Sequence, residues 1–457
     1  MPNDENQKLS PMLNIEQFYI EQYLLDEVER RPDLIEVRWD CKVTKVERST
    51  KEVLLGLSTP KGDYTAVTDW LVACDGGRSL VREALGLELK GASYEGRYVI
   101  VDIELESDLP TERLAWFDPP SNPGSSILMH RQPDNIWRID YQLNKDEDAD
   151  EAIKPENVIP RVQSHLDMIG QKGKWSPIWI TIYKAHALTL DRYEHGRVLF
   201  AGDAGHLVPI FGVRGANSGI DDADNLAWKL ALTVKGVASD KILKSYSDER
   251  VFAAQENLNY GTKSTEFMAP PSFAFELMRE AVLSLAVKHP AVRSLINPRQ
   301  TASITYTRSA LNCQGDNSAS FRSGPSIGGV LTECPITVVN GSCQLPGYLT
   351  DLMKPQFTVF CFTEKGELPR ELNSLLSECR RLEIPFGLVA ISRVKPLAAE
   401  GNVAWDHSGK LFAMYDARPG TCYFVRPDGH VQSRWRETSG VVVRRELEFI
   451  LAAGTAD

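Results

Sequence analysis

The chain has 457 residues, of which 42% are hydrophobic and 25% charged, and this is the profile of a globular protein with two or three domains. Its formal net charge of -11 excludes broad binding to nucleic acid or to anionic membranes, because both need a basic surface. No apolar run is long enough to span a bilayer and the amino end lacks the pattern of a signal peptide, so we expect a cytoplasmic protein.

The 8 cysteines are scattered along the chain, and none of them forms a C-x-x-C pair. They are too sparse for a disulfide framework and too dispersed for a zinc site. We therefore expect no metal centre and a reducing compartment.

The first predicted element is a helix over residues 15–30, where apolar residues recur at helical spacing before Pro32. Short β-rich runs follow at residues 42–46, 53–57 and 70–74, with Lys61-Gly62-Asp63 as a turn between them. This alternation of helix and strand indicates an α/β layer.

The pattern then changes to strands separated by polar turns, which predicts an antiparallel sheet inserted into the α/β unit. The predicted strands cover residues 98–103, 126–130, 136–142 and 178–183. A charged stretch at residues 145–151 is typical of the start of a solvated helix.

An apolar run returns at residues 198–201, and a glycine-rich loop after it leads into a long helix that begins around residues 217–219. One apolar stripe of that helix is formed by Ile220, Ala223, Ala227, Leu230 and Val234. Residues 240–292 are also predicted to be helical.

The polar, irregular stretch of residues 298–326 is predicted to be a linker. Beyond it, strands are predicted at residues 357–362, 386–391, 409–415 and 421–425, some with helices between them. This pattern indicates a separate small α/β domain.

The most informative stretch is GDAGHLVPIFGVRGANSGIDDADNLAWKL, residues 202–230. It combines a strand that ends in an acidic turn with a glycine-punctuated loop that opens a helix. Glycines 212, 215 and 219 let the backbone approach a flat ligand closely, and the helix start aims free N–H groups at it. Asp203 at the strand end can accept hydrogen bonds from ligand hydroxyls. The alternative, glycine and aspartate serving turn geometry alone, fits a lone Gly-Asp pair far better than this whole run.

A second motif, DGGRSLVR at residues 75–82, lies upstream of the first, with the predicted sheet between them. Asp75-Gly76 is expected to form a strand-end turn, and Arg78 and Arg82 are cationic groups one helical turn apart. Alone, such a motif is more often a plain turn followed by a helix, but the two motifs in this order are specific.

Together the two motifs resemble the signatures of class A FAD-dependent aromatic hydroxylases, nearest to the phenol hydroxylase and 3-(3-hydroxyphenyl)propionate hydroxylase branch. The resemblance covers almost the whole chain, and YFVRPDGH at residues 423–430 is similar to the thioredoxin-like tail of that branch. It implies a mixed α/β protein: an incomplete Rossmann-like FAD-binding domain with an inserted antiparallel substrate sheet, followed by a thioredoxin-like domain. The expected boundaries are 1–97 and 184–297 for the FAD-binding parts, 98–183 for the substrate sheet, 298–326 for the linker and 327–457 for the tail.

The resemblance also implies roles for individual residues. Asp203 would hold the ribitol of FAD, and the backbone at Gly215, Ala216 and Asn217 would lie near the flavin pyrimidine ring. The remaining cofactor candidates are Pro209 near the isoalloxazine, Gly212 in the same loop, Asp75 in a motif associated with FAD and NAD(P)H, and Gln17. The assignment of Gln17 is open, because the cofactor-contacting residue could instead be Gln22, or both glutamines could simply be polar residues of the helix surface.

The implied reaction uses NAD(P)H to reduce FAD and O2 to hydroxylate a small phenolic or aromatic compound. Substrate contacts are expected from the inserted sheet, where His130, Arg138, Tyr141 and His186 are candidates by location only; each is individually more often an ordinary satisfied sheet residue. A His or Tyr there could help to deprotonate a phenol. No cysteine pair occupies a redox position in the tail, so a structural role, with homodimer contacts among its uses, is expected.

The sequence departs from the family in one respect: it contains no G-x-G-x-x-G loop, which in family members receives the FAD pyrophosphate at a helix start. By the resemblance, the chain is expected to begin roughly a hundred residues into the family's length. Three readings follow: an incomplete chain of a hydroxylase, a non-catalytic remnant that acts as a binding or assembly protein, or an enzyme completed by another chain.

Overall fold

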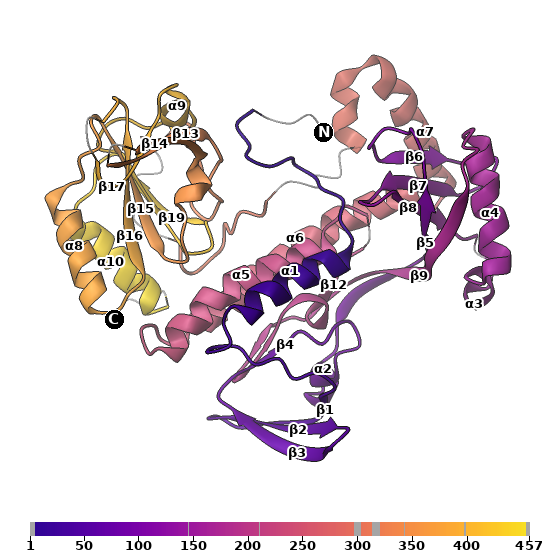
Figure 1. Cartoon of the computed structure of the whole chain (residues 1–457), viewed down its shortest axis with the longest axis horizontal. Coiled ribbons are helices and arrows are strands. Elements are labelled where there is room, and N and C mark those ends of the chain that lie inside the picture. Colours follow the sequence, from indigo (N-terminus) through magenta and orange to yellow (C-terminus); the bar gives the residue numbers. More distant parts are fainter. Residues whose placement is uncertain are drawn as a thin grey trace.

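The computed structural model of the protein describes residues 5–144, 146–209, 211–296, 303–312, 320–341, 343–396 and 399–453. Two long helices, α5 (Gly215–Val234) and α6 (Ile242–Met268), run through the middle of the molecule (Figure 1). A six-stranded sheet lies at one end of this helix pair and a seven-stranded sheet at the other. The predicted mixed α/β class is confirmed.

The amino-terminal part contains a helix and a three-stranded antiparallel sheet, followed by a short strand and a short helix. Its elements are α1 (Gln17–Glu29), β1 (Lys42–Arg48), β2 (Val53–Thr59), β3 (Gly62–Thr68), β4 (Leu71–Ala73) and α2 (Leu80–Ala84). The predicted helix and strands are present, but β3 was missed. Thr59 pairs with Gly62, so residues 60 and 61 form the hairpin turn and Gly62 already belongs to the strand.

A small second sheet brings together segments that lie far apart in the sequence. Strand β11 (Val198–Phe200) runs parallel to β4 and pairs on its other side with β10 (Glu194–His195). All three residues of β11 are buried. The carboxyl ends of β4 and β11 therefore meet at one edge.

The inserted antiparallel sheet is present, with strand order β12-β9-β5-β8-β7-β6. Its strands are β5 (Lys90–Leu105), β6 (Leu114–Phe117), β7 (Ser126–Arg131), β8 (Ile136–Gln142), β9 (Trp175–Thr189) and β12 (His206–Leu207). Helices α3 (Ala149–Ala152) and α4 (Pro155–Met168) connect β8 to β9, and Asp148 caps α3 by accepting two backbone N–H bonds. One face of the sheet is apolar and packs on Val158, Val162 and Leu166 of α4.

The apolar stripe predicted for the long helix does not face the core. Ile220 is 57% exposed and Val234 is 65% exposed in α5. The buried face is instead largely polar, with Asp222, Asn225 and Lys229 all buried. This polar face can be buried because α6 supplies charged partners for its side chains. The hydrophobic pattern of one helix cannot reveal partners that lie in another.

Helix α7 (Phe273–Lys288) and the 3-10 helix η2 (Pro290–Ile296) complete the predicted helical stretch. Within the described ranges, no helix combines the length and the apolar character that crossing a bilayer requires. The described residues of the predicted linker, 303–312 and 320–326, contain no strand or α-helix, and its other residues lie outside the described part.

The chain ends in an α/β unit, residues 335–451, called here the carboxyl-terminal unit. Its sheet has the order β14-β13-β17-β16-β15-β18-β19, with β15 parallel to β16 and antiparallel to β18. The elements are β13 (Pro335–Gly341), β14 (Cys343–Tyr348), η4 (Leu349–Leu352), β15 (Phe357–Thr363), α8 (Arg370–Arg381), β16 (Phe386–Ser392), β17 (Ala399–Trp405), α9 (Lys410–Met414), β18 (Cys422–Val425), β19 (Val431–Trp435) and α10 (Gly440–Leu451). Its likeness to thioredoxin and the domain boundaries remain predictions.

The predicted strand at residues 409–415 was wrong, because this segment forms the helix α9. Gly409 adopts a left-handed φ of 73°, and the Asp406 carboxylate accepts the backbone N–H of Phe412. Both features start a helix. Leu411 and Phe412 are buried, so a short apolar run was mistaken for a strand.

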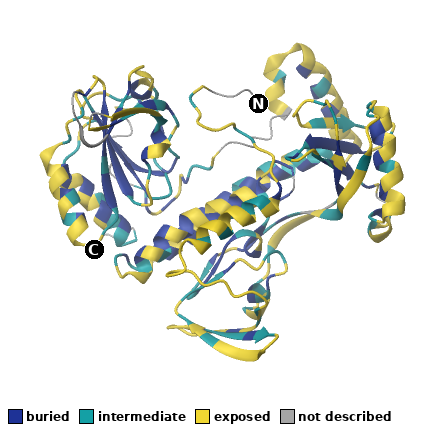
Figure 2. Ribbon diagram, in the orientation of Figure 1, coloured by how far each residue is buried: buried dark blue, intermediate teal, exposed yellow. Residues whose placement is uncertain are grey.

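The carboxyl-terminal unit shares a hydrophobic core with the helix pair. Trp228 of α5 packs edge-on against Phe357 of β15, with ring centroids 5.5 Å apart, and Leu232 belongs to the same cluster. Figure 2 shows this buried interior along α5, α6 and the central strands, whereas α1 is mainly exposed. No residue of α1 is buried, and Phe18, Tyr23 and Leu24 are exposed.

Candidate functional site

The two sequence motifs meet at the carboxyl ends of β4 and β11. The N–H of Ala201 donates to the carbonyl of Ala73 at 3.0 Å, which continues the parallel pairing past the strand ends. Arg82 then bridges the motifs, because its guanidinium donates to the carbonyl of Ala204 at 3.0 Å and to that of Gly77 at 2.6 Å. Ligands of open α/β sheets bind at such an edge.

The turn after β11 touches the first turn of α5 through glycine backbones. Gly202 has a φ of 61°, which favours glycine. A Cβ atom placed on Gly219 would lie in van der Waals contact with the Cα of Gly202, at 3.4 Å, so the two backbones lie side by side here. This contact brings Asp203 and the amino end of α5 to one place.

Asp203 presents an available carboxylate at this edge. The residue is exposed, and within the described part of the chain no group hydrogen-bonds its side chain. Partial desolvation by the surrounding protein nevertheless raises the pKa of Asp203, although the nearby His206 acts to lower it. A carboxylate so placed can accept hydrogen bonds from the hydroxyls of a ligand.

The amino end of α5 presents backbone donors. Arg214 occupies the N-cap position without a side-chain cap bond, and the first turn contains no acidic residue. The N–H groups of Gly215, Ala216 and Asn217 therefore lack the usual intrahelical partners, and the helix dipole adds positive potential there. No other atom lies within 4 Å of a Cβ placed on Gly215, so a ligand can come close.

Val213, immediately before the helix, has a φ of 55°. A β-branched residue in the left-handed region is strained, typically by about 1–3 kcal/mol, and such strain concentrates at ligand sites. A cavity of about 610 Å³ opens beside this loop. Its lining includes Val213, Arg214, Asn217 and Asp221, together with Lys8 and Glu333.

Two of the other loop candidates are engaged with the protein itself. Pro209 is buried against α6, where a Cβ on Gly261 would lie 3.1 Å from its ring. The side-chain amide of Asn217 donates to the carbonyl of Val213 at 2.7 Å, which leaves its backbone N–H facing the helix start. Gly212 has a φ of 109° and allows the loop to turn there.

The remaining cofactor candidates lie on α1 and after β4. Gln17 donates to Glu21 at 2.7 Å and Gln22 donates to Asp26 at 2.7 Å, so both carboxamides are engaged along the helix surface. This observation favours the alternative of helix-surface polarity. Asp75 is exposed and accepts the N–H of Val81 at 3.1 Å, which holds the motif's turn against α2.

The second face of the six-stranded sheet carries polar residues that the strand register brings together. His130 of β7 pairs with Arg138 of β8, and Arg138 pairs with Asp102 of β5. The Arg138 guanidinium donates two bonds of 2.8 Å to the Asp102 carboxylate. Asp140 lies two residues along β8 and so points from the same face.

This face is turned toward the loop before α5. Ile100 of β5 is the register partner of Asp140, and Tyr98, two residues earlier, lies on the same face. The ring of Tyr98 packs edge-on against Phe211 of the loop, with ring centroids 4.8 Å apart. Leu128 belongs to the same cluster. This apolar cluster and the polar residues of the strands therefore both border the region between the sheet and the loop.

Several polar atoms on this face are buried and lack a hydrogen-bond partner among the described residues. They are the hydroxyl of Tyr98, Nδ1 of His130 and Oδ1 of Asp140. Burial, with Arg113 and Arg138 nearby, lowers the pKa of His130 to about 3, and burial raises the pKa of Asp140 to about 6. Unpaired buried groups are costly, and several together with shifted pKa values mark a functional site.

The other two substrate candidates are not brought to this group. Tyr141 is odd-numbered on β8 and points to the opposite face, where it is buried in the core against α4. His186 lies beyond the irregularity in β9 and contacts the Ser93 hydroxyl at 3.0 Å. Sequence reasoning missed Tyr98 and Asp140. The signal was available, because each is a polar group at alternate positions of an otherwise apolar strand.

Comparison with known proteins identifies the family. The sequence model of the FAD binding domain family matches residues 2–260. The 3-(3-hydroxy-phenyl)propionate/3-hydroxycinnamic acid hydroxylase of Escherichia coli K12 is 28% identical over 335 residues, which are 71% of this chain and 57% of that protein. The same enzyme of Escherichia coli O139:H28 is 30% identical over 303 residues, 64% of this chain and 51% of that protein. The chain thus spans little more than half the length of the curated relatives it matches.

Solved structures share the fold. The flavin-dependent monooxygenase PieE, in complex with FAD and substrate, has a TM-score of 0.76 at 20% identity, over 95% of this chain and 80% of that one. Aklavinone-11 hydroxylase with FAD and aklavinone has a TM-score of 0.70 at 22% identity, over 96% and 78%. OxyS anhydrotetracycline hydroxylase from Streptomyces rimosus has a TM-score of 0.69 at 22% identity, over 97% and 80%. Since the family match covers more than half of its residues, this chain belongs to the FAD binding domain family.

Proposed function

We propose that the chain acts as an FAD-dependent monooxygenase that hydroxylates a phenolic or aromatic compound with NAD(P)H and O2. The observation that carries the proposal is the contact between Gly202 and Gly219, which brings the exposed carboxylate of Asp203 beside the uncapped amino end of α5. An acceptor for hydroxyls and a row of N–H donors suit the polyol chain and the ring edge of a flavin.

In this proposal Asp203 holds the ribitol, and the N–H groups of Gly215, Ala216 and Asn217 face the pyrimidine edge, where negative charge is stabilised. FAD, once bound and reduced by NAD(P)H, supplies the reaction of O2 with the aromatic ring. The chain's own residues fix the flavin in place and keep water from it, and Pro209 and Phe211 serve this second purpose because both are buried.

The substrate is proposed to bind at the polar face of the six-stranded sheet. Tyr98, His130 and Asp140 offer buried polar atoms that a phenolic hydroxyl can pair with. Oδ1 of Asp140 is the proposed acceptor of the phenolic proton, because a carboxyl with a pKa near 6 is ionised at neutral pH. Removing that proton makes the ring more nucleophilic. The names of the relatives, which act on hydroxylated phenyl compounds, support this class of substrate.

The test is the affinity of the purified chain for FAD. Replacing Asp203 with alanine should weaken FAD binding about tenfold or more, because a charge-assisted contact to hydroxyls is lost. The matched control is Asp191→Ala, which removes another exposed carboxylate, paired with Lys90 at the surface. Fluorescence titration with FAD measures both variants. Equal affinity in wild type and Asp203→Ala would sink the assignment of this residue.

The same sample distinguishes the proposed enzyme from a non-catalytic binding or assembly protein. A flavin absorption spectrum that survives gel filtration supports the enzyme, and a colourless protein that fails to take up added FAD contradicts it. Light scattering on that sample tests the accompanying proposal of a homodimer.

A further inference from the structure

The second half of the long motif, residues 222–230, is not used by the proposed cofactor contacts. Asp222, Asn225, Trp228 and Lys229 all lie on the buried face of α5. Four such side chains in two helical turns need partners, because an unpaired polar or charged group in a protein interior is costly. Their partners lie in α6, in the linker and in the carboxyl-terminal unit.

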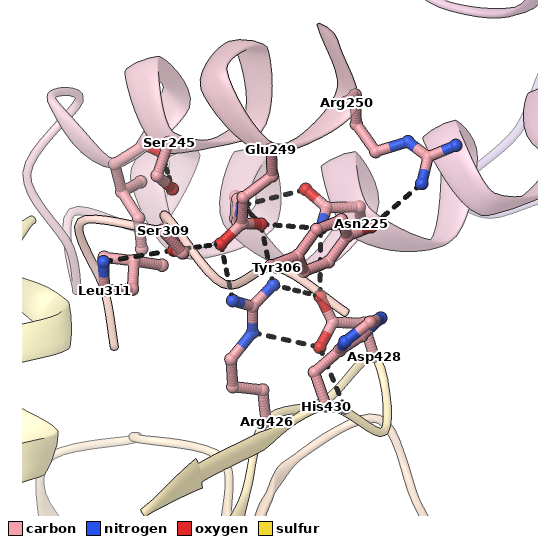
Figure 3. Close-up of polar contacts among 12 residues, drawn as sticks. Asn225, Ser245, Glu249, Arg250, Tyr306, Ser309, Leu311, Arg426, Asp428 and His430 are labelled. Carbon is pink, nitrogen blue, oxygen red and sulfur yellow. Dashed lines mark hydrogen bonds and ion pairs between the residues drawn. The ribbon is translucent and has the colours of Figure 1, made fainter. Parts of the chain in front are cut away.

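Glu249 of α6 is the centre of a buried cluster (Figure 3). Its carboxylate accepts from Lys229 at 2.7 Å, from Asn225 at 2.8 Å and from the two guanidinium nitrogens of Arg426 at 2.6 and 2.9 Å. Ser309 of the linker donates to it as well. The side chains of Glu249 and Lys229 are 0% exposed and that of Arg426 is 1% exposed, so water does not compete for these bonds.

The turn between β18 and β19 supplies the second acid of the cluster. Asp428 accepts from Arg426 at 2.5 Å and from the indole of Trp228 at 3.0 Å, and it also accepts from Asn225 at 3.2 Å. A turn of the carboxyl-terminal unit is thus fixed to α5 by two donors of that helix, Trp228 and Asn225. Although burial opposes ionisation, Arg426 holds the pKa of Asp428 below its usual value.

Tyr306 connects this cluster to a second one. Its ring stacks on His430, which follows the same turn, with centroids 4.3 Å apart and planes at 24°. Its hydroxyl accepts from the guanidinium of Arg250 at 2.9 Å. Figure 3 shows Tyr306 between Asp428 and His430 on one side and Arg250 on the other.

Arg250 continues the chain of contacts to the cofactor loop. It donates to Asp222 at 2.6 Å and to the carbonyl of Ser218, in the first turn of α5, at 3.1 Å. Asp222 in turn accepts the backbone N–H of Gly202 at 2.8 Å and Nε2 of His206 at 2.7 Å. Burial opposes ionisation of Asp222, but His206 and Arg250 outweigh it and keep its pKa low. The turn that carries Asp203 and the helix start opposite it are therefore held by the same guanidinium.

From this continuous path we infer that Tyr306 and Arg250 are positioning residues that couple the carboxyl-terminal unit to the turn at Gly202 and to the amino end of α5, and thereby set the geometry of the cofactor site. The inference rests on the proposed function, because the turn it positions is the one proposed to receive the flavin. Buried ionic contacts of this kind tolerate few alternative arrangements, since each misplaced charge loses its partner in a medium of low dielectric constant.

The experiment uses the full chain with Tyr306 replaced by phenylalanine, because replacing Arg250 leaves Asp222 buried without its cation and threatens folding. Phenylalanine keeps the ring on His430 and removes only the hydroxyl that Arg250 contacts. The control is Tyr423→Phe, which removes a hydroxyl bond of 2.7 Å to the Tyr415 carbonyl inside the carboxyl-terminal unit, away from Arg250. Hydrogen–deuterium exchange of the Gly202 amide is followed without flavin, and FAD affinity is measured separately by fluorescence.

In Tyr306→Phe we expect the Gly202 amide to exchange about tenfold faster and FAD to bind more weakly, as for the loss of one hydrogen bond to a charged group, with neither change in Tyr423→Phe. Unchanged exchange at Gly202 in Tyr306→Phe, or equal acceleration throughout both variants, would overturn the coupling. If wild type fails to bind FAD while Gly202 still responds to Tyr306→Phe alone, the coupling stands and the proposed function fails.

Discussion

Single buried ionisable residues decide how this protein responds to pH. His165 of α4 is 0% exposed, packs edge-on against Trp116 and contacts the Ser121 hydroxyl at 3.1 Å. Burial lowers the pKa of His165 from 6.5 to about 4. The folded protein thus binds fewer protons than the unfolded chain between these values, so the stabilisation is complete above pH 6.5 and is lost as the pH falls toward 4.

Replacing His165 with glutamine should remove this acid-sensitive part of the stability. For wild type, we expect a loss on the order of 3 kcal/mol from this group between pH 6.5 and 4. Chemical denaturation at a series of pH values measures the slope, and the exposed His407→Gln serves as control. Identical slopes in wild type and His165→Gln would refute the assignment.

Asp140 is the residue whose charge should control substrate activation. Asp140→Asn preserves the shape of the side chain but cannot accept the phenolic proton, so phenol-stimulated NAD(P)H oxidation should fall about a hundredfold. In wild type the rate should rise with pH through about 6, and this limb should be absent from the variant. Ionisation of a buried carboxyl costs stability as the pH rises through its folded pKa, so the variant should be no less stable than wild type at pH 8.

Steady-state rates over pH, with FAD content measured in parallel, provide the test of Asp140. The exposed Asp108→Asn is the control, because it removes a carboxylate from the loop that follows β5. A normal rate in Asp140→Asn, or a loss of FAD with the loss of rate, would place the residue elsewhere in the mechanism.

At the scale of elements, the joint between β11 and α5 combines close backbone contact with strain. Gly202 lies against Gly219, and Val213 holds a φ of 55° just before the helix. The surrounding loop maintains this conformation at a cost to stability, while the helix start keeps its N–H groups uncapped.

Val213→Gly should relieve that strain. We expect the free energy of unfolding to stay level or to rise by about 1 kcal/mol, because glycine adopts a positive φ without steric cost. The comparison is Val67→Gly on the exposed side of strand β3, which should cost about 1 kcal/mol. Urea denaturation of both variants decides the matter, and a larger loss at Val213 than at Val67 would contradict the strain argument.

For the whole molecule, the buried ionic cluster joins the carboxyl-terminal unit to the helix pair. Arg426→Met should destabilise the protein by about 3–5 kcal/mol, since the buried Asp428 loses its ion pair with Arg426 and the buried Glu249 loses one of its two cations. Arg444→Met removes an ion pair with Glu378 whose side chains are 44% and 26% exposed, and should cost less than about 1 kcal/mol. Thermal and urea unfolding compare the two. A similar small loss in both would show that the cluster is not what holds the parts together.

Much of the fold could be predicted from local patterns. The helix at residues 15–30 and the strand β8 at residues 136–142 follow from periodicity alone. The short apolar run at residues 409–415 could not be settled in this way, because Gly409 starts a helix where the pattern indicated a strand. The stripe through Ile220 was likewise misleading, because partners outside the helix decide which face is buried.

The sequence by itself determined the family, the mixed α/β class and the loop of residues 202–219, because glycine spacing and strand-to-helix changes are local properties of the chain. Only the tertiary structure decided that Tyr141 faces away from His130 and that Asp140 faces with it, since strand register sets which side chains share a face. It alone also brought Asn225 and Lys229 together with Arg426, about two hundred residues away along the chain, on the carboxylate of Glu249. The physical reason is that buried charges are stable only with partners, and those partners are brought close by folding rather than by sequence.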